Sequence, residues 1–476
     1  MRRWAIALLS GLLLTLGLPA GAWAAAPPAA SSSCVPVGDQ GLFADALHGS
    51  FSVPGETDCL ELTSSPGAVI DVVLPARATG AARPQSTLVN GDGTDLCETN
   101  GCALTGPGPY RILLTARGGA VGDYRLAVQR MDHVQGCPTV PLSDIGDEAP
   151  ITATFSADRF ATCYRIPADQ HAAVEAWSVV RTGGGGSVIT VAHNAELNGS
   201  GPCGSNALVT SYVGFCRLEA AKAYTFFVTA EATDAQYRVT RRDAGATTAT
   251  CATPASTTLG GPGVVETLQA ADDIHCYRVT GSAADSYWLG ATRPAGTGRA
   301  LTMDADGEYR CILSTRLVTF CRASGSTAYT TFVWPEKNAT NVTYRFDSWN
   351  LGTDSTPPAQ CPVVAGAPGF GPLTGTLTEQ QTAACVAVPV SGPSTFSATI
   401  TNTAGGTELP EPYYLRTTGS GRAEQSCAQH TETTRGCFLY EQGDGMALFL
   451  ITKPTVTGTY PYRVETGCYP EACDAQ

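Results

Sequence analysis

The chain has 476 residues, of which 15% are charged and 8% are aromatic, and its formal net charge is −13 at pH 7. This negative balance disfavours nucleic acid and anionic membrane surfaces as partners on electrostatic grounds. The length exceeds what one hydrophobic core usually organises, so two to four domains are expected.

The N-terminal segment has the composition of a secretory signal peptide. Two arginines precede an apolar run that ends near Leu18, and small residues follow at the positions that specify cleavage. The alternative is a membrane anchor, but the run is shorter than the ~20 apolar residues that a spanning helix needs. We therefore predict a signal peptide over residues 1–25 that is cleaved near Ala24 or Ala25, a secreted extracellular protein, and no integral membrane segment after cleavage.

All 18 cysteines follow this segment, and an even number in an exported chain indicates disulfides. Zinc would need close Cys-x-x-Cys pairs, and the sequence has none. Sixteen cysteines form four sets: the first two of each set are 25, 26, 25 and 24 residues apart, and the last two 5, 13, 10 and 10. The sets are Cys34, Cys59, Cys97, Cys102; Cys137, Cys163, Cys203, Cys216; Cys251, Cys276, Cys311, Cys321; and Cys361, Cys385, Cys427, Cys437, with Cys468 and Cys473 left near the end.

Each set begins a repeat of single-domain size. The first cysteines are 103, 114 and 110 residues apart, too long for a solenoid repeat or a propeller blade. We therefore predict four domains in series over residues 34–131, 137–242, 251–349 and 361–466, here called repeats 1 to 4, and a cysteine-containing tail over residues 467–476.

Each repeat closes on a segment in which Tyr-Arg is followed by an apolar residue, as in GDYRLAVQR, GTYPYRVE and their counterparts. Apolar residues alternate with others there, which predicts a strand with one buried face. We expect the tyrosines to lie in the core, and the arginines to point outward, where they could bind an acidic glycan, contact a neighbouring domain or pair across strands on the sheet surface. The tyrosines are Tyr124, Tyr237, Tyr344 and Tyr462, and the arginines are Arg125, Arg238, Arg345 and Arg463.

Further strand signals precede this segment in every repeat. A second β-rich run lies about fourteen residues earlier, and the turn residues between the two runs predict a closing hairpin. Asn, Asp and Gly ahead of each third cysteine, as in NGDGTDLC and MDADGEYRC, predict loops between paired strands. Helical periodicity with caps is hard to find, so we predict an all-β protein of four tandem, jelly-roll-like β-sandwich domains stapled by disulfides.

The segment DGTDLCETNGCALTGPGPYRILLTARGGAVGDYRLAVQR resembles the bacterial pre-peptidase C-terminal domain, a small β-sandwich appended to secreted proteases and other exported proteins. The similarity is strongest over the last 40 or so residues of each repeat. The four-cysteine pattern departs from that family and is similar to tandem repeats of actinobacterial secreted proteins of unknown role. The resemblance implies a fold and a compartment but no catalytic residues, because no peptidase domain accompanies the repeats.

Two disulfide schemes fit the spacing. The short interval between the third and fourth cysteines favours pairing within a repeat, with Cys468 bonded to Cys473 and the first cysteine of each set bonded to the second. The alternative links successive repeats, for instance Cys59 to Cys137, and leaves Cys34 and Cys473 unpaired. We prefer the first scheme, which implies beads on flexible joints, whereas the second implies a braced rod.

No motif of a serine hydrolase, zinc peptidase, phosphate loop or dinucleotide site occurs, and no cofactor is expected. The six histidines do not recur at equivalent positions; His171 and His193 share repeat 2 with several acids, but nothing places them together.

Acidic turns are weak calcium candidates, although they lack the distal Glu of a calcium loop and read more simply as hairpin turns. One turn holds Asp92 and Asp95, and the other holds Asp304, Asp306 and Glu308. Four tryptophans suggest either a sugar-stacking platform or core packing; they are Trp177, Trp288, Trp334 and Trp349.

These observations predict a secreted, non-catalytic array that binds an extracellular glycan or protein, or acts as a spacer, at the cell exterior. The alternative is a secreted hydrolase whose active site lies in one divergent repeat, where His and carboxylate side chains from distant parts of the sequence would meet in a cleft. Oligomeric state is not predicted by the sequence.

Overall fold

The computed structural model describes residues 34–76, 83–98, 101–194, 203–231, 233–245, 250–293, 297–313, 318–336, 338–353, 356–364, 370–390, 394–416, 425–431, 434–441 and 445–468. The predicted signal peptide and the last eight residues of the predicted tail lie outside these ranges. Within them the protein is built from strands β1 to β34 and two short 3-10 turns, η1 (Gly41–Phe43) and η2 (Arg117–Gly119), so the predicted all-β class is confirmed. The number of independent domains stays a prediction.

Each repeat contributes two sheets that face each other. We call the sheet that carries the second cysteine the head sheet, and the sheet that carries the Tyr-Arg strand the tail sheet. In repeat 1 the head sheet has the order β1 (Val35–Val37), β3 (Thr57–Leu62), β8 (Tyr110–Ala116) and β5 (Pro84–Val89). The tail sheet has the order β2 (Leu47–Phe51), β9 (Gly122–Arg130), β4 (Val69–Val73), β7 (Gly101–Ala103) and β6 (Cys97–Glu98).

Repeat 2 follows the same plan. Its head sheet has the order β12 (Ala161–Ile166), β17 (Tyr224–Ala230), β14 (Val188–Asn194) and β15 (Gly204–Val209). Its tail sheet has the order β10 (Leu142–Ser143), β18 (Ala235–Asp243), β13 (Val174–Gly184) and β16 (Ser211–Arg217), and β11 (Ile151–Phe155) also pairs with β18.

In repeat 3 the head sheet has the order β20 (His275–Thr280), β25 (Ala328–Pro335), β22 (Gly298–Asp304) and β23 (Tyr309–Leu313). The tail sheet has the order β19 (Val264–Leu268), β26 (Val342–Gly352), β21 (Ser286–Thr292) and β24 (Val318–Ser324). Strands β19 and β20 are therefore edge strands of the two facing sheets.

In repeat 4 the head sheet has the order β28 (Ala383–Val390), β33 (Gly445–Thr452) and β30 (Glu411–Arg416). The tail sheet has the order β27 (Leu373–Leu377), β34 (Tyr460–Cys468), β29 (Ser394–Asn402), β32 (Thr434–Glu441) and β31 (Gln425–Thr431).

Alternation along the strands builds one core between the two sheets of each repeat. In β8 every second residue from Tyr110 to Ala116 is buried, and these side chains meet Leu126 and Val128 of β9. The four tyrosines of the Tyr-Arg segments lie in the four equivalent cores, and each is at most 6% exposed. The segment is thus a central strand of the tail sheet, and its tyrosine anchors that sheet in the core.

The predicted closing hairpin is wrong. β8 belongs to the head sheet and β9 to the tail sheet, and β17/β18, β25/β26 and β33/β34 are divided in the same way. Each of these is a central strand with a neighbour on both sides, so the two consecutive runs cannot pair with each other and the chain crosses between sheets instead. The loops ahead of the third cysteine join paired strands in repeats 2 and 3, where β14 pairs with β15 and β22 with β23, and in repeat 1 an antiparallel bridge between Val89 and Asp95 closes the loop. The corresponding loop of repeat 4 lies outside the described residues.

Among the described residues seven disulfides are present, and each of them lies within one repeat. The first and second cysteines are bonded in every repeat: Cys34–Cys59, Cys137–Cys163, Cys251–Cys276 and Cys361–Cys385. The third and fourth are bonded in three repeats: Cys97–Cys102, Cys203–Cys216 and Cys311–Cys321. The side chains of Cys427, Cys437 and Cys468, and all of Cys473, lie outside the described part of the chain.

The disulfide between the third and fourth cysteines links different elements in different repeats. Cys97–Cys102 joins the neighbouring strands β6 and β7 within one sheet, as expected for a hairpin staple. Cys311–Cys321 joins β23 of the head sheet to β24 of the tail sheet, and Cys203–Cys216 likewise reaches β16 from the head-sheet side. In repeats 2 and 3 this bond therefore clamps the two sheets together rather than closing a hairpin.

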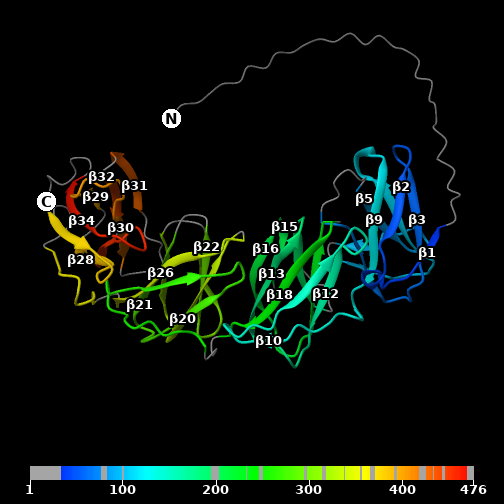
Figure 1. Ribbon diagram of the computed structural model, residues 1–476, viewed down its shortest axis with the longest axis horizontal. Helices are drawn as coiled ribbons and strands as arrows, with labels where there is room; N and C mark the ends of the chain where they lie inside the picture. The colour runs from blue at the N-terminus through cyan, green and yellow to red at the C-terminus, as the bar shows by residue number, and fades with distance from the viewer. Residues whose placement is uncertain are drawn as a thin grey trace, which may run out of the picture.

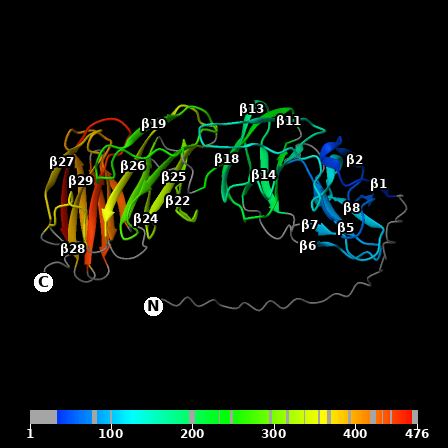
Figure 2. The same ribbon diagram turned by 90° about the horizontal axis from the view of Figure 1, so that it is seen from below.

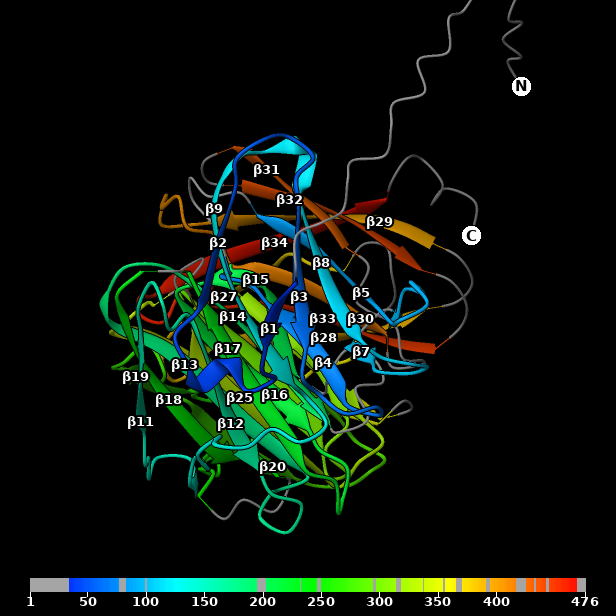
Figure 3. The ribbon, with the colours of Figure 1, turned by 90° about the vertical axis from the view of Figure 1, so that its right-hand side faces the viewer.

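The repeats are stacked in chain order. Figures 1 and 2 show the four groups of strands following one another along the long axis, from blue to red, and Figure 3 looks along that row with the blue strands in front. The tail sheet of each repeat packs on the head sheet of the next through a further buried apolar cluster. The inference that bonds confined to each repeat give beads on flexible joints is therefore wrong, because the joints are themselves packed.

Candidate functional site

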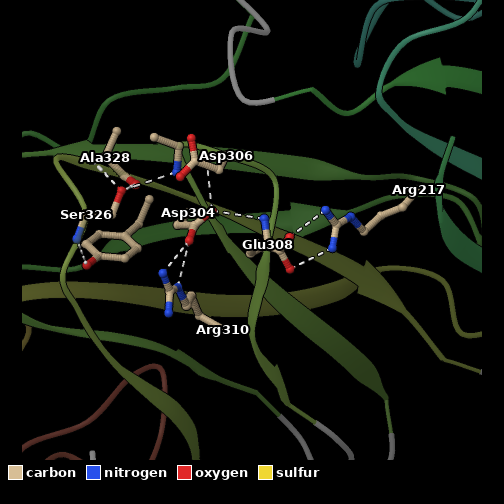
Figure 4. Close-up of polar contacts among 9 residues, drawn as sticks. Arg217, Asp304, Asp306, Glu308, Arg310, Ser326 and Ala328 are labelled. Carbon is tan, nitrogen blue, oxygen red and sulfur yellow. Dashed lines mark hydrogen bonds and ion pairs between the residues drawn. The ribbon is translucent and has the colours of Figure 1, made fainter. Parts of the chain in front are cut away.

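The acidic turn of repeat 3, a candidate calcium site, is occupied by arginines and backbone amides (Figure 4). Asp304 is buried; its Oδ1 accepts bonds from the amides of Asp306 and Glu308 at 3.0 and 2.9 Å, and its Oδ2 accepts one from Arg310 Nε at 2.8 Å. Glu308 faces away, toward Arg217 of repeat 2, with two contacts of 2.6 Å. These carboxylates already have partners, so the turn serves the fold and the joint between repeats 2 and 3.

The corresponding turn of repeat 1 has the same geometry. Asn90 Oδ1 accepts bonds from the amides of Asp92 and Thr94 at 3.0 Å, and Asp95 Oδ1 accepts one from the amide of Cys97 at 3.0 Å. Within the described ranges no group of three or more His, Cys, Asp or Glu is arranged to hold a metal. The calcium interpretation has no support from either turn.

Three of the four repeated arginines, Arg125, Arg238 and Arg345, contact the next repeat, which was one of the three expected roles. Arg125 Nε lies 3.4 Å from the carboxylate of Asp158, which also contacts His48 Nε2 at 2.9 Å. Arg238 forms an ion pair with Asp272, which is 1% exposed, in repeat 3. Surface pairing across strands, the plainer expectation, is therefore wrong for these two arginines, because the acids that they pair with belong to the next repeat.

The joint between repeats 3 and 4 buries its arginine completely. Arg345 Nε lies 3.0 Å from both carboxylate oxygens of Asp347, two residues along β26. Its other nitrogens donate to the carbonyls of Lys453 and Thr455 in repeat 4 and to the hydroxyl of Thr292. The prediction of an outward-pointing arginine holds for the direction of the side chain and fails for its exposure, because repeat 4 covers it.

Apolar side chains fill the same joints. Trp288 and Trp349 stack with centroids 5.3 Å apart, and Tyr413 of repeat 4 packs edge-on against Trp288. In the joint between repeats 2 and 3, Phe215 contacts the rings of Phe332 and Trp334. Three of the four tryptophans singled out therefore serve joints; only Trp177 lies in the core of its own repeat. None of the four forms an exposed sugar platform.

The joint between repeats 3 and 4 contains a cavity of about 10 Å³, room for about one water molecule. It lies between Ser286 and Leu351 of repeat 3 and Leu415 and Leu448 of repeat 4.

Repeat 2 carries a buried ion pair that the sequence did not reveal. Arg241 and Glu175 are 1% and 0% exposed, with Arg241 Nε 2.8 Å from Glu175 Oε2. Glu175 also accepts a bond from Trp177 Nε1 at 3.0 Å, and the other guanidinium nitrogens donate to the carbonyls of Val140 and Gln170. The guanidinium is fully bonded within its own repeat, so the pair orders the core and offers no ligand site.

The structure does not bring His171 together with an acid. His171 Nδ1 lies 3.1 Å from the carbonyl of Ala172, and its ring packs edge-on near Tyr224. The side chain of His193 lies outside the described residues.

Repeat 3 brings together a different set of polar side chains, which we call the tyrosine cluster: Glu266 on β19, His275 and Tyr277 on β20, and Tyr344 on β26. His275 Nδ1 lies 2.7 Å from the Tyr344 hydroxyl and 2.9 Å from Glu266 Oε2. The Tyr277 hydroxyl lies 2.8 Å from Glu266 Oε2 and in contact with the Tyr344 hydroxyl, which in turn lies 3.4 Å from Glu266 Oε2. Side chains from three strands thus converge on one point.

The topology explains this convergence. His275 and Tyr277 share one face of β20, the face toward the core, while Cys276 between them faces repeat 2. Glu266 stands directly opposite Tyr344 in the antiparallel pairing of β19 and β26. Because β19 and β20 are edge strands of facing sheets, the cluster lies at the open edge of the sandwich, with its phenols buried and the His275 and Glu266 side chains 29% and 42% exposed.

Both phenols are held in their protonated form. Burial first, then the neighbouring Tyr277 and the Glu266 carboxylate, raise the pKa of Tyr344. Burial is the main cause that raises the pKa of Tyr277; its bond with Tyr344 opposes this, and the hydrogen bond and charge of Glu266 add smaller upward shifts.

The core position of Tyr344 was expected from the sequence, but its polar partners Glu266, His275 and Tyr277 were not. The signal was present in the repeat register: the residue opposite the core tyrosine is Gly49 in repeat 1, Ala153 in repeat 2 and Gly375 in repeat 4, but Glu266 in repeat 3. A Cβ at Gly49 would lie 2.2 Å from the Tyr124 ring, which explains the small residue there. An acidic residue at this position marks repeat 3 as divergent.

Comparisons with known proteins do not assign this chain to a family. No family model matches the chain, and no curated protein is similar to it. Among solved structures, those of infectious bursal disease virus strains Gx and Gt align with 8% identity over 88% and 89% of this chain and 81% of each viral chain, with TM-scores of 0.14 and 0.10. Scores this low carry no argument about fold or function.

The described part of the chain contains no apolar helix of membrane-spanning length. The seven disulfides are compatible with an extracellular protein.

Proposed function

We propose that this protein is a secreted, non-catalytic rod of four β-sandwich domains, similar to pre-peptidase C-terminal domains, that binds or spaces an extracellular glycan or protein at the cell exterior. The observation that carries the proposal is the packed joint: at each of the three junctions the tail sheet of one repeat is buried against the head sheet of the next. A chain that only needed to carry independent binding modules would gain nothing from burying tryptophans and ion pairs at these junctions.

Charge supports the same role. In the second and third joints an arginine compensates an acid that is shielded from water: Arg238 pairs with Asp272, and Arg345 pairs with Asp347. An unpaired buried charge costs several kcal/mol, so these pairs favour one relative orientation of neighbouring repeats. A fixed orientation is what a spacer requires, because it sets the distance between the two ends.

The hydrolase alternative has one observation in its favour, the meeting of His275 with Glu266 in a single repeat. The groups nearest to this pair are two protonated phenols of raised pKa, which makes them poor nucleophiles. The non-catalytic interpretation therefore fits the cluster better.

One experiment distinguishes the non-catalytic function from the hydrolase. The exported protein would be incubated with cell-wall material from the producing organism, sedimented, and assayed in parallel against panels of glycosidase, esterase and peptidase substrates. We expect co-sedimentation without turnover. Turnover that disappears in the His275→Ala variant would contradict the proposal and establish the hydrolase.

A further inference from the structure

The tyrosine cluster holds more close polar contacts than it has protons to make them. Five contacts of at most 3.4 Å join four atoms: Glu266 Oε2, His275 Nδ1 and the two hydroxyls of Tyr277 and Tyr344. The two phenols supply one proton each, His275 Nδ1 supplies at most one, and the carboxylate supplies none. Lone pairs are therefore in excess at the centre of the cluster, which is the arrangement that a cation satisfies.

The spacing fits a small ion. Neighbouring ligands of an octahedral ion with bonds of about 2.0–2.1 Å lie roughly 2.9 Å apart. Three of the five contacts, Tyr344 to His275, Tyr277 to Glu266 and Glu266 to His275, measure 2.7, 2.8 and 2.9 Å. Tyr344 to Glu266 is longer, at 3.4 Å, and the two hydroxyls lie closer together, so they would have to move apart around an ion. The three donor types, phenol, carboxylate and imidazole, are hard or borderline ligands of the kind that iron accepts.

We propose that Glu266, His275, Tyr277 and Tyr344 form a binding site for ferric iron at the edge of repeat 3. Charge suits the trivalent ion: when both phenols are deprotonated, two phenolates and one carboxylate carry three negative charges, imidazole is neutral, and Fe³⁺ makes the half-buried site electrically neutral. A divalent ion is neutralised by Glu266 and a single phenolate, so it would use only one of the two phenols as an anionic ligand.

Binding displaces two protons. The phenol hydrogens of Tyr277 and Tyr344 leave to solvent through the exposed edge formed by His275 and Glu266, and the ion takes their place; no electron transfer is involved. Fe³⁺ overcomes the preference of these groups for their neutral form because a bound cation reverses the local electrostatics. Entry from solvent is open, since His275 and Glu266 lie at the surface.

The other repeats provide built-in controls. Repeat 2 keeps both phenols, Tyr164 and Tyr237, but places Thr162 and Ala153 where repeat 3 has His275 and Glu266. Repeats 1 and 4 keep one core tyrosine each, opposite glycine. The complete donor set therefore occurs once in the described chain.

The test adds ferric nitrilotriacetate to the full mature protein and records visible absorption, because iron bound to phenolate has a ligand-to-metal charge-transfer band that adventitious iron on carboxylates lacks. We expect a band that saturates at one ion per chain. Absence of the band, or saturation well above one ion per chain, would overturn the proposal.

Variants sharpen the assignment. Tyr344→Phe is expected to abolish the band, whereas Tyr237→Phe, the same change at the equivalent position of repeat 2, is expected to leave it intact. Glu266→Ala copies the residue of repeat 2 and so suits the fold; it is expected to weaken iron binding at least tenfold in competition with nitrilotriacetate. A band that survives in both Tyr344→Phe and Glu266→Ala, or that is lost equally in Tyr237→Phe, would contradict the site.

Discussion

Arg345 and Arg463 occupy the same position in the same repeated segment, and their surroundings differ completely. Arg345 is buried in the joint between repeats 3 and 4, where it contacts Asp347 and two carbonyls of the next repeat. Arg463 lies on the tail sheet of repeat 4, pairs with Glu465 at 2.6 Å, and is about half exposed. The segment therefore does not fix the role of its arginine; the presence of a following repeat does.

The outer faces of the tail sheets of repeats 3 and 4 also differ in how polar and how exposed they are. The outer face of β26 and β21 carries Trp349 and Trp288, both 1% exposed. The corresponding face of β34 and β29 carries Arg463, Glu465 and Thr399, which are exposed. An apolar face is found where a repeat packs on the next one and a polar face where none follows in the described chain, as in repeat arrays whose terminal units have a polar outer face.

The largest expected effect comes from Arg345→Ala. The substitution leaves Asp347 buried without its arginine and removes the donors to the carbonyls of Lys453 and Thr455, so we expect a loss of about 3–5 kcal/mol in the free energy of unfolding of the joint. Denaturant unfolding followed by tryptophan fluorescence checks this, because Trp288 and Trp349 report on that joint. An unchanged transition would mean that the joint is not formed in solution.

Phe215→Ala at the joint between repeats 2 and 3 is expected to cost about 3 kcal/mol. The ring fills the space between Phe332 and Trp334, and its removal leaves a cavity that the strands cannot close. Hydrogen exchange of the β13 and β25 amides is the suitable measurement, with faster exchange expected on both sides of the joint. Faster exchange in repeat 2 alone would show that the two repeats are not coupled.

Arg125→Ala should have a smaller effect, below about 1 kcal/mol, because both Arg125 and Asp158 are largely exposed and water screens their attraction. His48 also remains as a partner for Asp158. Thermal unfolding of the variant should differ from the parent mainly at low ionic strength. A loss as large as that of Arg345→Ala would imply that the first joint is as tightly closed as the third.

Arg463→Ala is the matched control and should be close to neutral, within about 0.5 kcal/mol, because an exposed pair contributes little. The same denaturant experiment used for Arg345→Ala applies. A strong destabilisation here would break the comparison, since it would show that the segment stabilises its own repeat rather than a joint.

Much of the fold follows from local patterns in the sequence. Alternation in YRILLTA and YRLAV predicts two strands with their buried faces, and β8 and β9 have those faces. The cysteine intervals predict bonds within repeats, as in Cys34–Cys59. These predictions succeed because period-two burial and short-range cross-links depend on neighbours in the sequence.

What the sequence did not predict depends on contacts between distant segments. Alternation assigns Arg345 to the face opposite Tyr344 but does not say whether water or another sheet covers that face. Likewise, two consecutive β-rich runs suggest a hairpin unless both are known to be central strands of different sheets. The tyrosine cluster needed the pairing of β19 with β26 before Glu266 and Tyr344 could be placed opposite each other.

The account rests on rigid joints, and the most direct test is the distribution of distances between spin labels on exposed residues of repeats 1 and 4. Positions such as Val53 and Thr399 are exposed and lie away from the joints. We predict one narrow distance distribution in the parent protein that broadens in Arg345→Ala and is unchanged in Arg463→Ala. A broad distribution in the parent protein would contradict the account. It would show that the repeats are independent domains on flexible linkers.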